Sequence, residues 1–154
     1  DSKYRQNNLF ERLLNLDSRN WQIRLPTEWE WQWMAQGGRE SLLYPWGNIL
    51  DKLYANTADA EIGLSIVGIY PKDKSNSGAL DVIGNLQEWC FNNHDIQSIS
   101  HPNQDVYSNK GKKSLRGASF FHKASKSKNT HREFNRYPNQ AYNYYGFRVI
   151  IAPS

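Results

Sequence analysis

Asp81-Val-Ile-Gly-Asn-Leu-Gln-Glu-Trp89, in the middle of the 154-residue chain, joins an apolar pair to a turn and two carboxylates. Gly84-Asn85 signals a turn, because glycine tolerates positive φ and asparagine bonds its own backbone. The turn leaves carbonyl oxygens between the carboxylates of Asp81 and Glu88. A hard cation requires several such oxygen ligands at fixed distances. The stretch therefore predicts either a cation site or two solvated acids, and spacing alone does not separate these two interpretations.

The length of the chain fits one domain with a single hydrophobic core. Six Trp, nine Tyr and six Phe in an otherwise polar sequence favour a loop-rich α+β domain over a helical bundle. We expect residues 1–154 to form one domain, and Asp1 in the place of Met indicates the C-terminal part of a longer protein. No apolar run reaches the length of a membrane span, and no signal peptide is recognised.

The single cysteine, Cys90, excludes an internal disulfide and a metal site built from several thiolates. Because Cys90 follows Trp89 in an apolar run, we expect a buried structural thiol. One unpaired cysteine suits a reducing compartment, so a cytoplasmic location is expected.

Two short helices and several short strands are predicted. Apolar residues at three- and four-residue spacing indicate an amphipathic helix at residues 6–16. Thr27, with Glu30 three positions later, forms a capping box that opens a second helix. Trp29 and Trp33 lie one turn apart on this helix, and we expect both in the core. Strands are expected at residues 21–25, 64–70, 114–120 and 145–151.

Five short motifs are spread along the chain in a fixed order. They are Arg24-Leu-Pro-Thr-Glu28, Tyr44-Pro-Trp-Gly-Asn48, Gly84-Asn-Leu-Gln-Glu-Trp89, Arg116-Gly-Ala-Ser119 and Gly146-Phe-Arg-Val149. Together they resemble the formylglycine-generating-enzyme, or sulfatase-modifying-factor, superfamily. The resemblance implies a variant of the C-type lectin fold, loop-rich, with small antiparallel sheets and two short helices.

The resemblance also implies a structural calcium ion. In the superfamily this ion is held by the side chains at the positions of Asp81 and Glu88, and by the carbonyl oxygens at the positions of Gly84 and Leu86. This sequence keeps oxygen-bearing side chains at both positions, so the resemblance favours a calcium ion that pins a long loop. A second family site would involve Asn56 and Thr57, but its acidic ligand does not align, and that site stays open.

The enzymes of the superfamily carry two copper-binding cysteines shortly after the motif at residues 116–119. Copper(I) prefers such soft thiolates, but this chain has His122 near the first position and Ser127 near the second. Cys90 lies in a different motif and cannot supply a pair. The resemblance therefore predicts a chain without the oxidase activity. The alternative is a divergent metal-dependent enzyme of the formylglycine-generating or sulfoxide-synthase kind.

Residues 120–145 interleave aromatic rings with Asn, Ser and basic side chains. Antibody paratopes have this composition, since rings supply contact area at low entropy cost. The segment also resembles the variable region of retroelement-diversified proteins, a branch of the same fold. We predict a non-catalytic recognition domain that binds a protein ligand through Phe121, His122, Lys123, Phe134, Arg136, Tyr137, Tyr142, Tyr144 and Tyr145. An ordinary family loop with half-buried rings is the alternative.

Positive charge is concentrated at residues 110–136, which hold nine Lys and Arg against one acid, Glu133. Such a segment steers acidic protein partners, and it also predicts nucleic-acid binding, because rings between basic side chains can stack on bases. Binding to nucleic acid would weaken steeply with salt. A solvated basic loop is the third interpretation.

Overall fold

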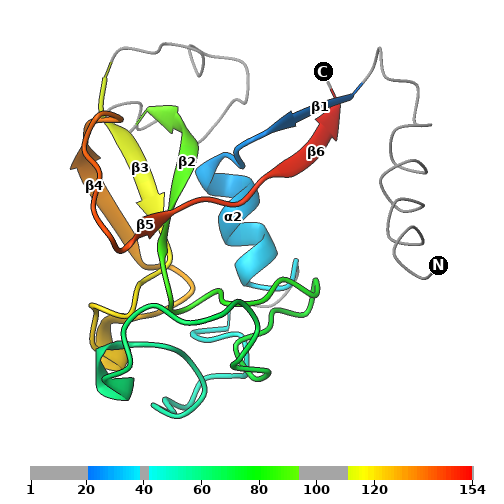
Figure 1. The fold of residues 1–154 in the computed structure, drawn as a ribbon. Helices are drawn as coiled ribbons and strands as arrows, with labels where there is room; N and C mark the ends of the chain where they lie inside the picture. The colour runs from blue at the N-terminus through cyan, green and yellow to red at the C-terminus, as the bar shows by residue number, and fades with distance from the viewer. Residues whose placement is uncertain (1–20, 39–41, 94–110, 154) are drawn as a thin grey trace, which may run out of the picture. The chain divides into compact units, whose positions relative to one another are not determined.

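The computed structural model describes residues 21–38, 42–93 and 111–153. The helix predicted at residues 6–16 lies outside these described residues. The contacts divide the chain into two units, one of Asp1–Arg24 with Val149–Ser154 and one of Leu25–Arg148. In the first unit, β1 (Trp21–Arg24) pairs antiparallel with β6 (Ile150–Pro153), which confirms the strand predicted at residues 21–25 (Figure 1).

The second unit contains a four-stranded sheet with the strand order β4-β3-β2-β5. Its strands are β2 (Gln87–Asn93), β3 (Lys113–Arg116), β4 (Arg132–Arg136) and β5 (Tyr145–Gly146). The first three strands pair antiparallel, but β5 runs parallel to β2. The predicted strand at residues 145–151 is therefore divided between β5 and β6, and this sheet is mixed where an antiparallel one was expected.

The helix α2 (Glu28–Ala35) begins at the predicted capping box, where the Glu30 N–H donates to Thr27 Oγ1 at 3.2 Å. Trp31 is almost fully buried in the core, together with Ala35 one turn later. Trp29 and Trp33 are 62% and 61% exposed, so the prediction that both belong to the core is wrong. Each lies two positions from Trp31, and two positions along a helix point to nearly opposite faces.

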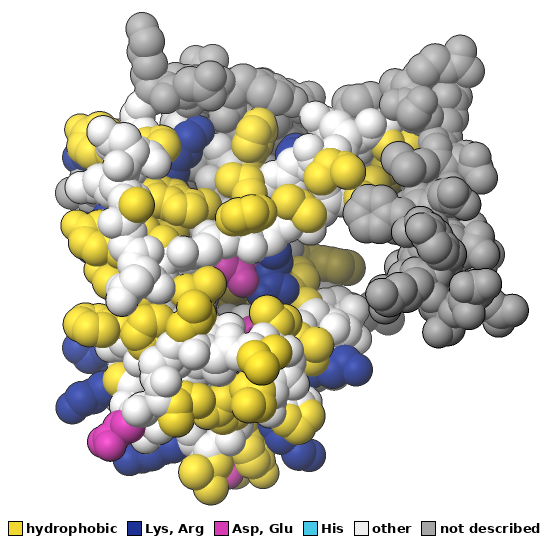
Figure 2. Space-filling model, viewed as in Figure 1, with side chains coloured by type: hydrophobic (Ala, Val, Ile, Leu, Met, Phe, Trp, Pro, Cys, Tyr) yellow, Lys and Arg dark blue, Asp and Glu magenta, His cyan; other side chains and the backbone are white. Residues whose placement is uncertain are grey.

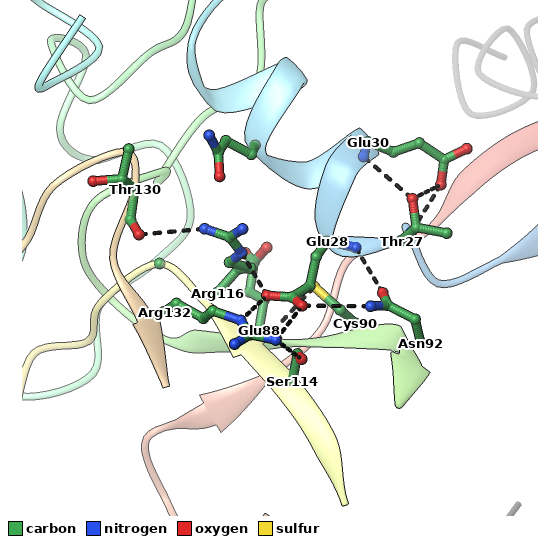
Figure 3. A network of polar contacts seen from close by, with 12 residues as sticks. Thr27, Glu28, Glu30, Glu88, Cys90, Asn92, Ser114, Arg116, Thr130 and Arg132 are labelled. Carbon is green, nitrogen blue, oxygen red and sulfur yellow. Dashed lines mark hydrogen bonds and ion pairs between the residues drawn. The ribbon is translucent and has the colours of Figure 1, made fainter. Parts of the chain in front are cut away.

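A buried ion network joins α2 to the sheet (Figure 3). The Glu28 carboxylate accepts hydrogen bonds from Arg132 Nε at 2.5 Å and from Arg132 Nη2 at 2.7 Å. Arg116 Nε lies 2.9 Å from the same carboxylate. Burial opposes ionisation of Glu28, but the two guanidinium groups outweigh it and lower the pKa of Glu28. The network fixes β3 and β4 against the helix, and both strands lead into the segment that carries the predicted binding residues.

Irregular loops and two short 3₁₀ helices, η3 (Ala58–Ala60) and η4 (Ala124–Lys126), complete this unit. Residues 64–70 form no strand, so the strand predicted there is wrong. The apolar side chains of this loop are exposed, and Ile66 is 81% exposed. Hydrogen bonds to side chains hold the loop where a strand would have a backbone ladder, since the Ser65 N–H donates to Asn85 Oδ1 at 3.0 Å. Among the described helices, none has the length and apolar composition to cross a membrane.

Candidate ligand-binding surface

The turn that follows β3 carries two of the predicted binding residues, Phe121 and His122. Gly117 adopts the left-handed region, with φ +72°, close to the ring of Trp31, and such a position favours glycine. The His122 N–H donates to the Ser119 carbonyl at 2.9 Å, and the Phe121 N–H donates to Ser119 Oγ at 3.2 Å. Ser119 therefore fixes the backbone from which both side chains project.

Four of the predicted residues form one cluster of rings. Phe121 stacks on Tyr144 with a centroid distance of 5.3 Å, and Tyr142 also stacks on Tyr144 at 5.3 Å. Tyr145 meets Tyr144 edge to face at 4.8 Å. Phe121 is 68% exposed and Tyr142 is 45% exposed, so these two rings are open to a partner. Phe121, Tyr142, Tyr144 and Tyr145 are called the ring surface below.

Tyr145 anchors the ring surface to the sheet. Its ring meets Trp89 of β2 edge to face at 5.5 Å, and Tyr145 itself belongs to β5. Burial, followed by the nearby charge of Glu133, raises the pKa of Tyr145 to about 12. The phenol therefore stays neutral at physiological pH and acts as a packing group.

His122 joins the turn to the ring surface. Its Nδ1 accepts the Ser119 N–H at 3.2 Å and lies 2.8 Å from Ser119 Oγ, while its ring meets Tyr144 edge to face at 6.4 Å. Because Nδ1 accepts a backbone N–H, the proton of the neutral imidazole is on Nε2. Burial, and then the neighbouring His131, lowers the pKa of His122.

Three further predicted residues do not belong to the four-ring cluster, although one of them, Arg136, interacts with Tyr145. Tyr137 is 49% exposed, and the Lys112 ammonium lies 5.6 Å from its ring centre. Arg136 pairs with Glu133 beside it on β4. Phe134 belongs to β4, but its side chain lies outside the described residues.

The basic segment divides into internal and external charges. The guanidinium groups of Arg116, Arg132 and Arg136 are used in ion pairs with Glu28 and Glu133. The exposed cations close to the ring surface in sequence are Lys123, Lys126 and Lys128. Three of the nine positive charges of this segment are therefore paired within the fold, and nucleic-acid binding by residues 110–136 stays a prediction.

Three of the four predicted calcium ligands, Asp81, Leu86 and Glu88, line a cavity of about 320 Å³. Its lining also contains Arg148 and apolar side chains, Val67, Leu80 and Phe147. In the space-filling view of Figure 2, acidic and basic side chains lie next to each other near the middle of the molecular face shown, with apolar side chains around them.

Glu88 is already bonded through both carboxylate oxygens. Arg148 donates from Nε to Oε2 at 2.5 Å and from Nη2 to Oε1 at 2.7 Å, and Trp31 Nε1 donates to Oε2 at 2.6 Å. Asp81 Oδ2 accepts the Gly68 N–H at 2.8 Å. A calcium ion would have to displace the guanidinium from Glu88, so this arrangement does not fit the four-ligand set. Calcium at Asp81, Gly84, Leu86 and Glu88 stays a prediction. Among the described side chains, no three His, Cys, Asp or Glu gather as a metal site.

Asp73 holds the central stretch, and the sequence gives no signal for it. Its carboxylate accepts the N–H groups of Val82 at 3.1 Å, Ile83 at 3.0 Å and Gly84 at 3.3 Å. Burial raises the pKa of Asp73 to about 7, although the three donors favour the charged form. In sequence, Asp73 is one acid within a polar loop, and only the fold brings it beneath the turn.

Two potential nucleophiles are inaccessible. Ser119, His122 and Glu133 neighbour one another in space as the members of a hydrolase triad do. Ser119 Oγ lies 2.8 Å from His122 Nδ1, and His122 Nε2 lies 3.9 Å from Glu133 Oε2. Ser119 has no exposed surface, however, so a substrate cannot reach its hydroxyl. Cys90 is also buried, and burial raises the pKa of its thiol well above its ordinary value. In this arrangement neither group can attack a substrate.

A family model for the sulfatase-modifying factor enzyme 1-like domain matches residues 4–153. The chain belongs to this family. A relative named inactive C-alpha-formylglycine-generating enzyme 2, from Mus musculus, is 33% identical over 141 residues, which cover 81% of this chain and 42% of the relative. The serine/threonine-protein kinase pkn1 of Chlamydia pneumoniae is 35% identical over 137 residues, which cover 81% of this chain and 20% of the kinase.

Solved structures of similar proteins share the fold of this sulfatase-modifying-factor domain. Treponema denticola variable protein 1 superposes with a TM-score of 0.63 at 26% identity, covering 86% of this chain and 48% of that one. PvdO from Pseudomonas aeruginosa superposes with a TM-score of 0.66 at 21% identity, covering 96% and 58%. The α+β, C-type-lectin-like fold class is thereby confirmed. The chain spans less than half the length of the two sequence relatives named above.

Proposed function

We propose that this chain is a non-catalytic recognition module that binds a partner protein through the ring surface. The observation that carries the proposal is the stack of Phe121 and Tyr142 on Tyr144, with the first two rings open to solvent. Aromatic side chains give large contact areas at low entropy cost, and they are enriched among the few residues that carry most of the binding energy in protein interfaces. The exposed cation of Lys123 lies two residues from Phe121 and favours an acidic partner.

The buried positions of Ser119 and Cys90 support a function without catalysis. The relatives from Mus musculus and Bos taurus that carry the word "inactive" in their names support it as well. Among the described side chains, no three His, Cys, Asp or Glu lie together in a way that could hold a metal ion, and the single thiol, Cys90, is buried.

Capture experiments test the proposal. The native chain and the double variant Phe121→Ala with Tyr142→Ala would be immobilised, and proteins retained from an extract of the source cells identified by mass spectrometry. Trp29→Ala is the matched control, because Trp29 on α2 is also an exposed ring, at 62%, and does not belong to the predicted binding residues. The proposal predicts a protein that the native chain and Trp29→Ala retain and the double variant loses. Equal retention by all three chains would overturn it.

We further propose that residues 120–145 are the diversified part of a retroelement-linked variable protein. The likeness to Treponema denticola variable protein 1 supports this proposal. Sequencing the surrounding genome tests it: a near-copy of the coding stretch for residues 116–148, differing only at adenines, is the expected result. The absence of a near-copy would contradict diversification and leave a fixed binding module.

A further inference from the structure

His122 contacts both the turn that carries Phe121 and the ring against which Phe121 stacks. On one side, its Nδ1 accepts the Ser119 N–H at 3.2 Å, which closes the turn from Ser119 to His122. On the other side, its ring meets the edge of Tyr144 at 6.4 Å. Phe121 leaves the same turn and stacks on Tyr144. The His122 side chain thus joins the two supports of Phe121, the most exposed residue of the ring surface.

We propose that neutral His122 is the positioning residue of the ring surface, and that its protonation releases Phe121 from Tyr144. The proposal rests on the proposed function for its consequence, because a released Phe121 would weaken partner binding in mildly acidic conditions.

The hydrogen-bond chemistry gives the direction of the effect. In the neutral Nε2–H form, Nδ1 carries a lone pair and accepts the Ser119 N–H. Protonation adds a hydrogen to Nδ1, the second on the ring, and this new N–H then faces the Ser119 N–H donor to donor. Ser119 Oγ, 2.8 Å from Nδ1, can rotate to accept the new proton, so one contact survives and the backbone contact is lost.

The charged neighbours of His122 act in both directions. His131, whose ring centre lies 5.4 Å away, and Lys126 on η4 oppose a positive charge on His122. Glu133 of β4 favours it at 3.9 Å, but Arg136 already pairs with Glu133. Burial also opposes protonation, and the net result is a pKa of His122 below its ordinary value. His122 is therefore neutral at pH 7, and the transition falls on the acidic side of an unperturbed histidine.

Two variants test the positioning role of His122 separately from the stability of the fold. His122→Asn keeps an acceptor, since the asparagine Oδ1 can take the place of Nδ1, but it cannot be protonated in this range. His131→Asn is the matched control, because it removes the neighbouring imidazole and leaves the Ser119 contact intact.

NMR spectra of the whole chain between pH 7.5 and 5 test the proposal without knowledge of the partner. Long-range proton–nitrogen spectra should show the Nε2–H form of His122 at pH 7.5. The ring-current shifts of the Phe121 protons should be lost on acidification in the native chain, stay constant in His122→Asn, and be lost at higher pH in His131→Asn. An Nδ1–H form, or a Phe121 transition that persists in His122→Asn, would overturn the proposal.

The outcome is distinguishable from failure of the proposed function. If Phe121 moves with pH as expected but the ring variants retain every partner, the positioning role stands and recognition through the ring surface fails. If the ring variants lose a partner but Phe121 does not respond to His122, recognition stands and the positioning role fails.

Discussion

The buried ion network and the ring surface place very different demands on the chain. In the network, Arg116 and Arg132 contact the Glu28 carboxylate at distances of 2.5–2.9 Å. Arg148 contacts the Glu88 carboxylate in the same way, at 2.5 and 2.7 Å. In the ring surface, Phe121 and Tyr142 contact another ring on one side and solvent on the other. The first region tolerates few changes because each buried charge depends on its partner, whereas the second can change its outer rings without loss of the fold.

The largest effect is expected where the network loses its anion. Glu28→Gln leaves Arg116 and Arg132 without the carboxylate that both contact. Breaking a buried pair in this way typically costs about 3–5 kcal/mol. Urea unfolding of this variant should show the loss, with the exposed Glu61→Gln as control, for which a change within about 0.5 kcal/mol is expected. Equal stability of both variants would contradict an essential network.

At the Gly84-Asn85 turn, the addition of a single methyl group should reduce stability nearly as much. A Cβ at Gly84 would lie 2.2 Å from the carbonyl oxygen of Asn56. This oxygen belongs to the backbone, so it cannot rotate away as a side chain could. Gly84→Ala is expected to lose about 1–3 kcal/mol or more. Gly146→Ala is the matched comparison, because its Cβ would meet the flexible end of Leu86 at 2.7 Å. Thermal unfolding should rank Gly84→Ala well below Gly146→Ala, and the reverse order would be a contradiction.

Asp73 should make stability depend on pH in an unusual direction. Burial raises its pKa from 3.8 in the unfolded chain to about 7 in the folded one. Between these values the folded state binds more protons than the unfolded state, so stability falls as pH rises from about 4 to 7. In Asp73→Asn this contribution is absent, so between about pH 4 and 7 the stability should fall less steeply, or rise more steeply, with increasing pH than in the native chain. A zero or reversed difference would mean that the three N–H donors outweigh burial.

The smallest effect on stability is expected at the ring surface. Phe121→Ala removes one ring contact and Tyr142→Ala removes two, each worth about 0.5–1.5 kcal/mol, and both variants lose little buried area. Denaturant unfolding should place both variants close to the native chain. A loss as large as that of Glu28→Gln would show that these rings belong to the core and that the ordinary-loop interpretation is correct.

Much of the fold follows from local sequence signals. The capping box at Thr27 and the strand predicted at residues 21–25 depend on neighbours within a few positions, and the structure confirms them. The strand at residues 64–70 fails because its apolar pattern lacks a partner strand, and Asn85 and Asp81 bind its backbone. Pattern alone cannot distinguish a strand from an exposed apolar loop.

The candidate site was predictable in composition but not in electrostatics. The ring content of residues 120–145 indicates a contact surface, and the structure brings Phe121, Tyr142, Tyr144 and Tyr145 together. The roles of Asp73 and Arg148 were missed for different reasons. Asp73 accepts backbone N–H groups 9 to 11 positions away, which leave no side-chain pattern, whereas Arg148 pairs with Glu88 across 60 positions. Long-range pairing of charges requires the fold, since a single sequence records no distances.

The measurement that tests recognition most directly is a binding titration of a captured partner against three chains, each shown to be folded at the assay temperature. The native chain, Trp29→Ala and the double variant Phe121→Ala with Tyr142→Ala would be compared at one salt concentration. Loss of two central rings should weaken binding at least about tenfold, equivalent to about 1.4 kcal/mol, while Trp29→Ala binds like the native chain. Equal affinity of the double variant and the native chain would contradict recognition through the ring surface.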